Sequence, residues 1–209
     1  MMILFALLGT ALCIGTILFL ERNEEGLKLI GSKKDLLVIA GSFFIVEATL
    51  FSFTGYGREF ICHSLIFFYL ITASYIDNRT QQVYRVGSIV FIAFCATLFL
   101  CKDMGWEIRF EKTVSLLIFN MAVVAFGKME FMGWGDVLTF AGVSYWLGTF
   151  TDGILTLESC LYCMLFSSIL FVAVNVKDMD WGNLRMKEYR AFVPSIAGGA
   201  LITLAFISV

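Results

Sequence analysis

Residues 133–148 read GWGDVLTFAGVSYWLG, in which a Gly-x-Gly-Asp sequence opens an apolar run. The run is long enough to form most of a helix that crosses a bilayer, and Asp136 stands at its start. An ionisable group at the edge of such a segment is costly unless it has a partner or a function. If this run crosses a membrane, Asp136 therefore needs either a partner or a function.

The composition of the chain is that of a membrane protein. Of its 209 residues, 59% are hydrophobic and only 15% are charged, and the mean hydropathy is +0.87. Soluble domains are typically about 45–50% apolar and about 25% charged. A formal net charge of −2 gives no indication of nucleic-acid binding. We expect an all-α polytopic protein in the lipid bilayer, without a separate soluble domain.

Eight apolar segments predict eight transmembrane helices. A helix that crosses the bilayer needs roughly 20 apolar residues, or somewhat fewer when its ends are polar. The first segment lacks a basic start and a cleavage pattern, so it is expected to be a retained helix rather than a signal peptide. The predicted segments are 3–20, 36–54, 61–76, 87–101, 113–127, 137–150, 154–175 and 191–208.

The distribution of basic residues predicts the orientation of these helices, because cytoplasmic connections carry an excess of Lys and Arg. Eleven of the 15 basic residues fall in the first, third, fifth and seventh connections, and the other four fall in the second and fourth. The odd-numbered connections are therefore expected in the cytoplasm, and both termini are expected outside.

Four acidic residues lie within or at the ends of apolar segments, namely Glu47, Asp77, Asp136 and Glu158. In the predicted topology, Asp77 ends one helix at the cytoplasmic face and Asp136 begins another helix there. Two close carboxylates tend to share one proton. One of them can then take a proton from water while the other polarises a peptide carbonyl, which is the chemistry of aspartyl proteolysis.

The residues beside Asp136 fit this chemistry but also a simpler interpretation. Gly133 and Gly135 remove side chains, so a substrate backbone could approach closely, and a helix start favours a charged carboxylate. However, an Asp at a helix start is most often an N-cap. Asp77 could equally be an ordinary carboxylate of the membrane interface beside Arg79.

Three motifs, in order, resemble those of the type IV prepilin peptidases, which are membrane aspartyl proteases of the GxGD type. Residues 133–148 resemble the family's second aspartate motif. YIDNRTQQVYRVGS (75–88) resembles the first aspartate region, and FVPSIAGGALI (192–202) is similar to the final helix, which often carries a proline. The resemblance covers about residues 61–209 and implies a six-helix catalytic core there, preceded by two N-terminal helices and a charged cytoplasmic loop in residues 1–60.

The resemblance also implies a function and a set of site residues. It implies Asp77 and Asp136 as the catalytic pair, with Gly133, Gly135 and Pro194 supporting the active site. The implied activity removes the short basic leader peptide of prepilins or pilin-like proteins at the cytoplasmic face of a prokaryotic plasma membrane. This chemistry needs no metal and no organic cofactor.

The chain departs from the family pattern at several points. Val83-Tyr84-Arg85 stand where many members have Ile-Pro-Asn, and Leu138 stands where many have Lys. Larger bacterial members carry paired CxxC motifs after the first helix and also methylate the new N-terminus. Residues 21–35 contain no cysteine, so we expect no methyltransferase activity. Cys160 and Cys163 are expected to be small buried side chains rather than a metal site.

Two other functions remain open at this point. A small proton- or cation-coupled transporter could use Asp136, Glu47 and Glu158 as a relay, because ionisable residues inside a membrane often mark ion pathways. A non-catalytic subunit of a pilus or secretion assembly is the other possibility, although such a protein could lose either Asp and this chain retains both. Outside these readings, Glu47 is expected to form a buried hydrogen bond with a neighbouring helix.

Overall fold

Eight α-helices dominate the computed structural model, which describes residues 2–23, 29–151, 155–180, 185–186 and 190–207. The helices are α1 (Met2–Asn23), α2 (Lys33–Thr54), α3 (Arg58–Thr80), α4 (Arg85–Cys101), α5 (Trp106–Lys128), α6 (Trp134–Phe150), α7 (Leu155–Asn175) and α8 (Val193–Ile207). A short 3₁₀ turn, Val176–Asp178, follows α7. After it, β1 (Met179–Asp180) pairs antiparallel with β2 (Arg185–Met186).

Each helix overlaps one predicted segment, and the all-α polytopic membrane fold is confirmed, although α5 begins at Trp106, seven residues before the predicted start at residue 113. Helices α1, α2, α3, α5 and α7 are long and apolar enough to cross a membrane, and α4 and α8 are shorter apolar helices. Two predicted segment ends, residues 154 and 208, lie outside the described residues. The sixth segment was predicted to begin at residue 137, but α6 begins at Trp134, so Asp136 lies inside its first turn.

The outer surface of the bundle is apolar. Phe19 is 67% exposed and Leu37 is 73% exposed, and similar side chains cover the outward faces of most helices. Soluble monomers rarely expose large contiguous apolar patches, whereas lipid chains solvate such a surface. The interior holds the largest buried side chains, among them Phe67, Phe140 and Trp146.

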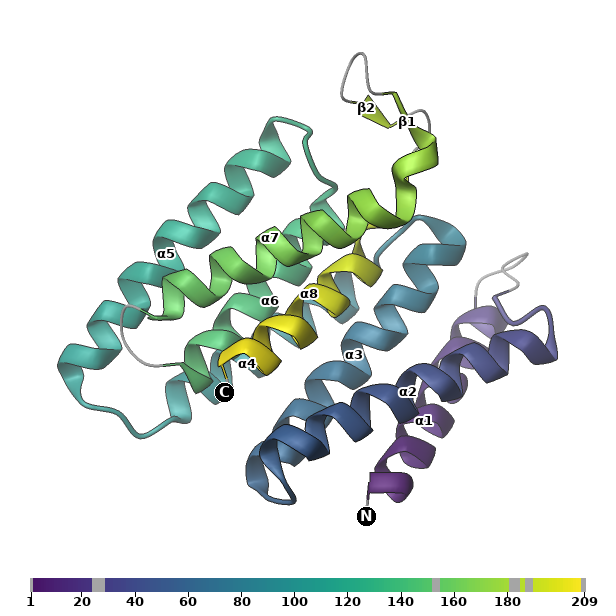
Figure 1. The fold of residues 1–209 in the computed structure, drawn as a ribbon, viewed down its shortest axis with the longest axis horizontal. Helices are drawn as coiled ribbons and strands as arrows, with labels where there is room; N and C mark the ends of the chain where they lie inside the picture. The colour runs from purple at the N-terminus through teal and green to yellow at the C-terminus, as the bar shows by residue number, and fades with distance from the viewer. Residues whose placement is uncertain (1, 24–28, 152–154, 181–184, 187–189, 208–209) are drawn as a thin grey trace.

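The helices alternate in direction, so their connections separate to two ends of the bundle. Figure 1 shows the ends of α1, α3, α5 and α7 and the starts of α2, α4, α6 and α8 at one end of the bundle, while α1 begins and α8 ends at the other. The odd-numbered connections thus share one end, as the distribution of basic residues predicts. The side of the membrane that this end faces stays a prediction.

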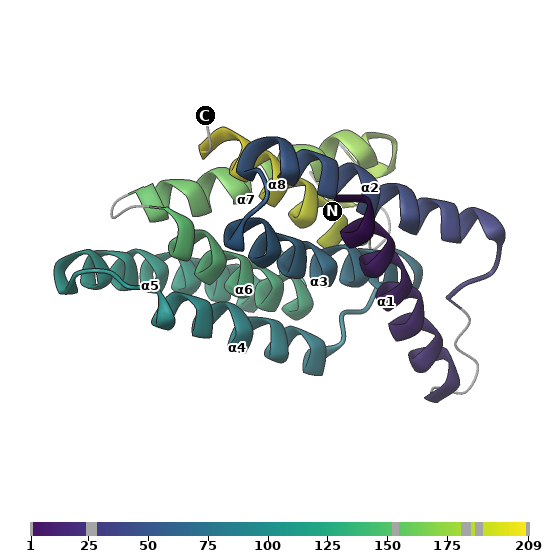
Figure 2. The same cartoon turned by 90° about the horizontal axis from the view of Figure 1, so that it is seen from below.

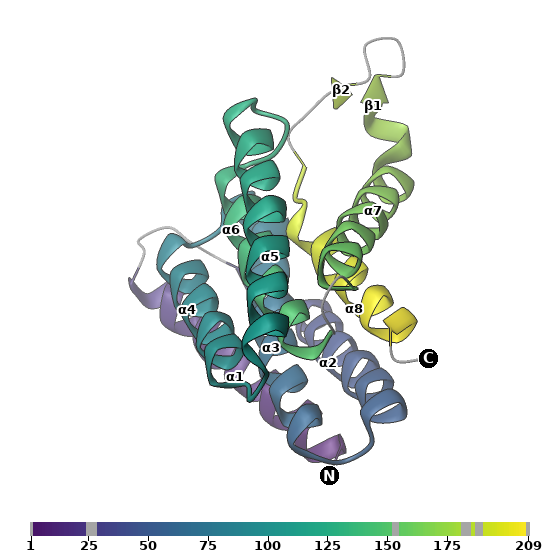
Figure 3. The same ribbon diagram turned by 90° about the vertical axis from the view of Figure 1, so that its left-hand side faces the viewer.

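Helix α6 lies among the helices that follow α2 in the chain. It packs against α4, α5, α7 and α8, and α8 in turn packs against α3 and α7. Helices α1 and α2 pack against each other, and both contact α3. Figure 2 shows α1 and α5 at opposite sides of the bundle, and in Figure 3 α5 lies in front of α1. Helices α1 and α2 therefore pack together on the side of the bundle formed by α3.

A buried hydrogen bond joins α3 to α6, the two helices that carry the candidate aspartates. Trp146 Nε1 donates to His63 Nδ1 over 3.0 Å, and both side chains are buried. Buried polar groups are nearly always paired, so this bond fixes the relative position of the two helices. His63 precedes Asp77 by 14 residues, which places the bond about 20 Å from Asp77 along α3.

Candidate active site

Asp77 ties the end of α3 to the start of α8. It lies in the last turn of α3 with 1% of its surface exposed. The backbone N–H of Val193, the first residue of α8, donates to Asp77 Oδ2 over 3.1 Å. The first N–H groups of a helix have no partner within the helix and form its positive end. An acidic side chain is therefore a suitable acceptor at this position.

The backbone after Asp77 turns sharply toward α4. Gln81 has a φ of 55°, which is the left-handed conformation that often ends a helix. Its N–H donates to the carbonyl oxygen of Asp77 over 2.7 Å. The main chain and the side chain of Asp77 are thus both held by hydrogen bonds, and the turn leads the chain to Val83.

Asp136 is held in a similar way at the start of α6. It is 4% exposed, and its Oδ2 accepts a hydrogen bond of 3.1 Å from the N–H of Gly133. Gly133 occupies the N-cap position. The interpretation of Asp136 as the N-cap residue is therefore wrong by three positions. Its carboxylate instead bonds back to the N-cap backbone from inside the first turn, as the acidic residue of a capping box does.

The structure brings Asp77 and Asp136 together at one end of the bundle. Both carboxyl groups are buried, and the segments that follow Asp77 and precede Asp136 meet where Val83 packs against Gly135. Arg79, the simple partner of Asp77 suggested by the sequence, forms an ion pair with Asp35 at the start of α2. Arg79 is therefore paired with Asp35, and the part of the simpler interpretation that placed Asp77 with Arg79 is wrong.

The space beside Gly135 is occupied by the α3–α4 connection. A Cβ atom on Gly135 would lie only 2.6 Å from the Cβ of Val83. Glycine is required at this position because Val83 packs against its backbone. The open space for a substrate that we expected beside Gly135 is filled by Val83, one of the residues at which the chain departs from the family pattern.

Pro194 lies next to the residue that binds Asp77. It is the second residue of α8, in the first turn, where proline is tolerated because it removes no bond within the helix. It also lines a cavity of about 350 Å³ between α2, α3 and α8. The sequence indicated Pro194 but not the hydrogen bond from Val193 to Asp77. That bond uses the backbone N–H, which is the same in almost every residue, so no residue type indicates it.

The other intramembrane acids do not join this pair. Ser64 of α3 donates to Glu47 Oε2 over 2.7 Å, which confirms the predicted bond of Glu47 to a neighbouring helix. Glu158 is exposed in the first turn of α7, which begins where α6 ends, whereas Asp136 lies at the start of α6. The arrangement therefore does not support a relay through these three acids.

Four of the six cysteines, namely Cys13, Cys95, Cys160 and Cys163, are buried, whereas Cys101 is exposed at the end of α4. Cys160 and Cys163 are buried on α7 and form no disulfide. Among the residues that the structure describes, no three His, Cys, Asp or Glu side chains lie together as a candidate metal site.

Comparison with known proteins matches the region that holds both aspartates. A family model described as the type IV leader peptidase family matches residues 64–176, just over half of the chain. The matched region runs from α3 to the end of α7 and leaves out α1, α2 and α8. No curated protein and no solved structure matches the chain.

Proposed function

The chain belongs to the type IV leader peptidase family, and from this membership we propose that it is an aspartic endopeptidase that uses Asp77 and Asp136. Its substrate is a prepilin or pilin-like protein, from which it removes a short basic leader peptide. The end of the bundle that carries both aspartates faces the cytoplasm at the plasma membrane of a prokaryote.

One observation carries this proposal. Two buried carboxyl groups, one in the last turn of α3 and one in the first turn of α6, lie at the same end of the bundle (Figure 1), and both fall inside the family-matched region. Burying two ionisable groups is costly, so a buried pair of acids usually has a chemical role. Arg79 does not neutralise Asp77, because it is paired with Asp35.

The pair performs peptide hydrolysis as general base and general acid. The ionised carboxylate accepts a proton from a water molecule, whose oxygen attacks the carbonyl carbon of the scissile bond. The protonated partner donates a hydrogen bond to the carbonyl oxygen. When the tetrahedral intermediate collapses, the C–N bond breaks and the leaving amine takes the proton that the first carboxylate accepted from water, so the pair again holds one proton. The protonation states belong to the pair rather than to either residue.

The surrounding backbone orients both carboxyl groups before the substrate binds. The N–H of Val193 holds one oxygen of Asp77, and the N–H of Gly133 holds one oxygen of Asp136. Gly135 allows Val83 to pack beside Asp136, and Pro194 begins the helix that holds Asp77. Such positioning lowers the barrier because the reacting groups need not be ordered during the reaction. No cofactor takes part, and no methyl transfer follows cleavage.

A cleavage assay tests this function. The probe is a synthetic prepilin peptide with a basic leader that ends in Gly and continues into an apolar segment. With the full chain in lipid nanodiscs, mass spectrometry is expected to show a single cut after that Gly. EDTA and serine- or cysteine-directed reagents should leave the rate unchanged, and S-adenosylmethionine should leave the product mass unchanged. A rate that EDTA abolishes would contradict the aspartic mechanism.

A further inference from the structure

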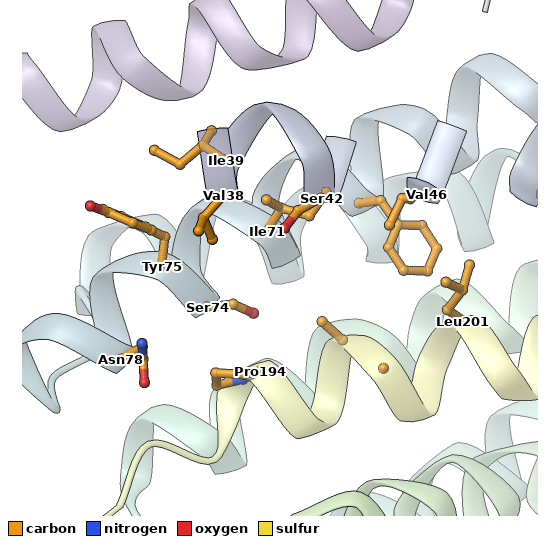
Figure 4. Close-up of a pocket in the computed structure, with 13 residues that line it drawn as sticks. Val38, Ile39, Ser42, Val46, Ile71, Ser74, Tyr75, Asn78, Pro194 and Leu201 are labelled. Carbon is orange, nitrogen blue, oxygen red and sulfur yellow. The ribbon is translucent and has the colours of Figure 1, made fainter. Parts of the chain in front are cut away.

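We propose that the groove between α2, α3 and α8 binds the apolar segment of the peptide substrate beside the scissile bond, and that Ser74 contacts the substrate backbone there. This inference rests on the proposed peptidase function. The walls of the α2–α3–α8 groove include Val38 and Ser42 of α2, Ile71 and Ser74 of α3, and Pro194 and Leu201 of α8 (Figure 4). Its volume of about 350 Å³ is in the range of ligand pockets.

The groove reaches the candidate catalytic pair. On α3, Ser74 precedes Asp77 by three residues and Asn78 follows it directly, and both line the groove. On α8, Pro194 lines the groove and follows Val193, whose N–H binds Asp77. Residues three apart are neighbours on a helix surface. A chain lying in the groove therefore passes within about one helical turn of the Asp77 carboxyl group.

Ser74 distinguishes a peptide from a lipid as the occupant. Its Oγ atom is buried and has no hydrogen-bond partner among the described residues. Figure 4 shows this side chain directed into the space between the three helices. A buried hydroxyl without a partner is unfavourable, and such groups are rare in native structures. A peptide backbone supplies a donor and an acceptor to Ser74, whereas a lipid acyl chain supplies neither.

The chemistry of intramembrane cleavage also favours a peptide with apolar side chains. The scissile bond has to leave any helical structure to be attacked, and backbone groups without partners are costly inside a bilayer. The groove has mainly apolar walls with the Ser74 hydroxyl among them, which suits a short unwound stretch of an apolar segment. Val38 is 59% exposed, so the groove opens at the outer surface of the bundle, where a membrane-embedded substrate arrives.

The groove gives the N-terminal helices a role. Helix α2 forms one wall, although it lies outside the family-matched region. Its start is fixed by Asp35, which accepts hydrogen bonds of 2.9 Å from the N–H groups of Gly31 and Ser32 and pairs with Arg79. The same ion pair joins α2 to the end of α3, two residues beyond Asp77. The ion pair between Arg79 and Asp35 therefore holds α2, which forms this wall of the groove, against the end of α3 that carries Asp77.

Photo-crosslinking tests the occupant of the groove. A benzophenone amino acid is placed at Val38 or, as the matched control, at Leu37, which is adjacent and more exposed but does not line the groove. The Asp136→Asn full chain in nanodiscs is irradiated with the synthetic prepilin peptide. We expect the peptide to be attached through its apolar segment at Val38 and at least tenfold less at Leu37. Attachment of lipid alone at Val38, or equal attachment of peptide at both positions, overturns the proposal.

A second pair of variants tests Ser74. Ser74→Ala is expected to raise KM for the peptide roughly three- to tenfold, the effect of one lost neutral hydrogen bond, with kcat changed less than about twofold. Ser168→Ala is the control, because Ser168 is an exposed hydroxyl on α7 that bonds to its own helix. An unchanged KM in Ser74→Ala overturns the contact.

The two measurements separate this inference from the proposed function. Cleavage by the wild-type chain without crosslinking at Val38 overturns the groove and leaves the peptidase assignment in place. Crosslinking at Val38 without cleavage by the wild-type chain supports the groove and contradicts the peptidase function. Absence of both overturns both.

Discussion

The backbone N–H of Val193 donates a hydrogen bond of 3.1 Å to the carboxylate of Asp77, 116 positions earlier in the chain. This bond places one candidate catalytic group at the positive end of α8, although α8 lies outside the family-matched region. The final helix is therefore part of the proposed active site through its backbone, and a change to that backbone is expected to affect catalysis.

Removing the N–H of Val193 tests this relationship. Val193→Pro loses the donor and keeps a φ that suits a first helical turn, whereas Val193→Ala keeps the donor and loses only packing. A hydrogen bond to a charged group contributes about 1.5–3 kcal/mol, so we expect kcat of Val193→Pro to fall roughly ten- to a hundredfold below that of Val193→Ala. Equal kcat values in the peptide assay would show that the bond does not orient Asp77.

Gly135→Ala is expected to disturb the active site from the side of Val83. The new Cβ would lie 2.6 Å from the Cβ of Val83, so the α3–α4 connection has to move away from Asp136. We expect at least a tenfold loss of kcat/KM, since small misplacements near reacting groups are costly. The double variant Gly135→Ala, Val83→Gly should recover most of the lost kcat/KM, because the side chain that the new Cβ would meet is removed.

A glycine elsewhere serves as the control for that series. A Cβ built on Gly41 of α2 would meet nothing within 4 Å apart from the nearby backbone of its own helix, so Gly41→Ala should leave the cleavage rate unchanged. If Gly135→Ala is as active as Gly41→Ala, then the packing of Val83 against Gly135 has no role in the site.

Trp146→Phe is expected to lower stability. The substitution removes the donor to His63 Nδ1 and leaves a buried acceptor without its partner. Such a loss costs about 1–3 kcal/mol, measured as the free energy of unfolding in mixed detergent micelles. Trp106→Phe is the control, because Trp106 is 79% exposed. Equal stability of the two variants would mean that the bond does not hold α3 against α6.

Glu47→Gln separates the peptidase from a proton- or cation-coupled transporter. The amide oxygen of Gln can still accept the hydrogen bond from Ser64, so the helix contact is kept while the ionisable group is lost. We expect the cleavage rate to change less than about twofold. Proton-coupled flux in liposomes that disappears in Glu47→Gln, together with absent cleavage, would support the transporter.

The helices could be predicted because the signal that defines them is local. An apolar run of membrane-spanning length forms a helix whatever its neighbours are, since lipid leaves no other partner for the backbone. It was also predictable that Asp77 and Asp136 lie at the same end of the bundle. Lys and Arg are concentrated in every second connection, and this pattern indicates which connections lie at the same end. The start of α6 was misplaced by three residues, since the hydrogen bond from the N–H of Gly133 to Asp136 places this polar side chain inside the first turn of the helix.

The contacts within the site could not be predicted from the sequence. The bond from Val193 to Asp77 uses a main-chain donor, and the contact of Val83 with Gly135 depends on how two connections meet. The pairing of Arg79 with Asp35 rather than with nearby Asp77 follows from the position of α2 on α3. Each of these contacts is set by helix packing, which no residue pattern records.

The cleavage rates of Asp77→Asn and Asp136→Asn test the central claim most directly. Asn keeps the size of the side chain and removes its ability to exchange a proton, so each variant should lose roughly 10²–10⁴-fold in kcat on the synthetic prepilin peptide. Asp103→Asn, which alters an exposed acid in the α4–α5 connection, should cleave at the wild-type rate. Cleavage by either Asp77→Asn or Asp136→Asn at a rate close to that of Asp103→Asn would contradict an aspartic pair at this site.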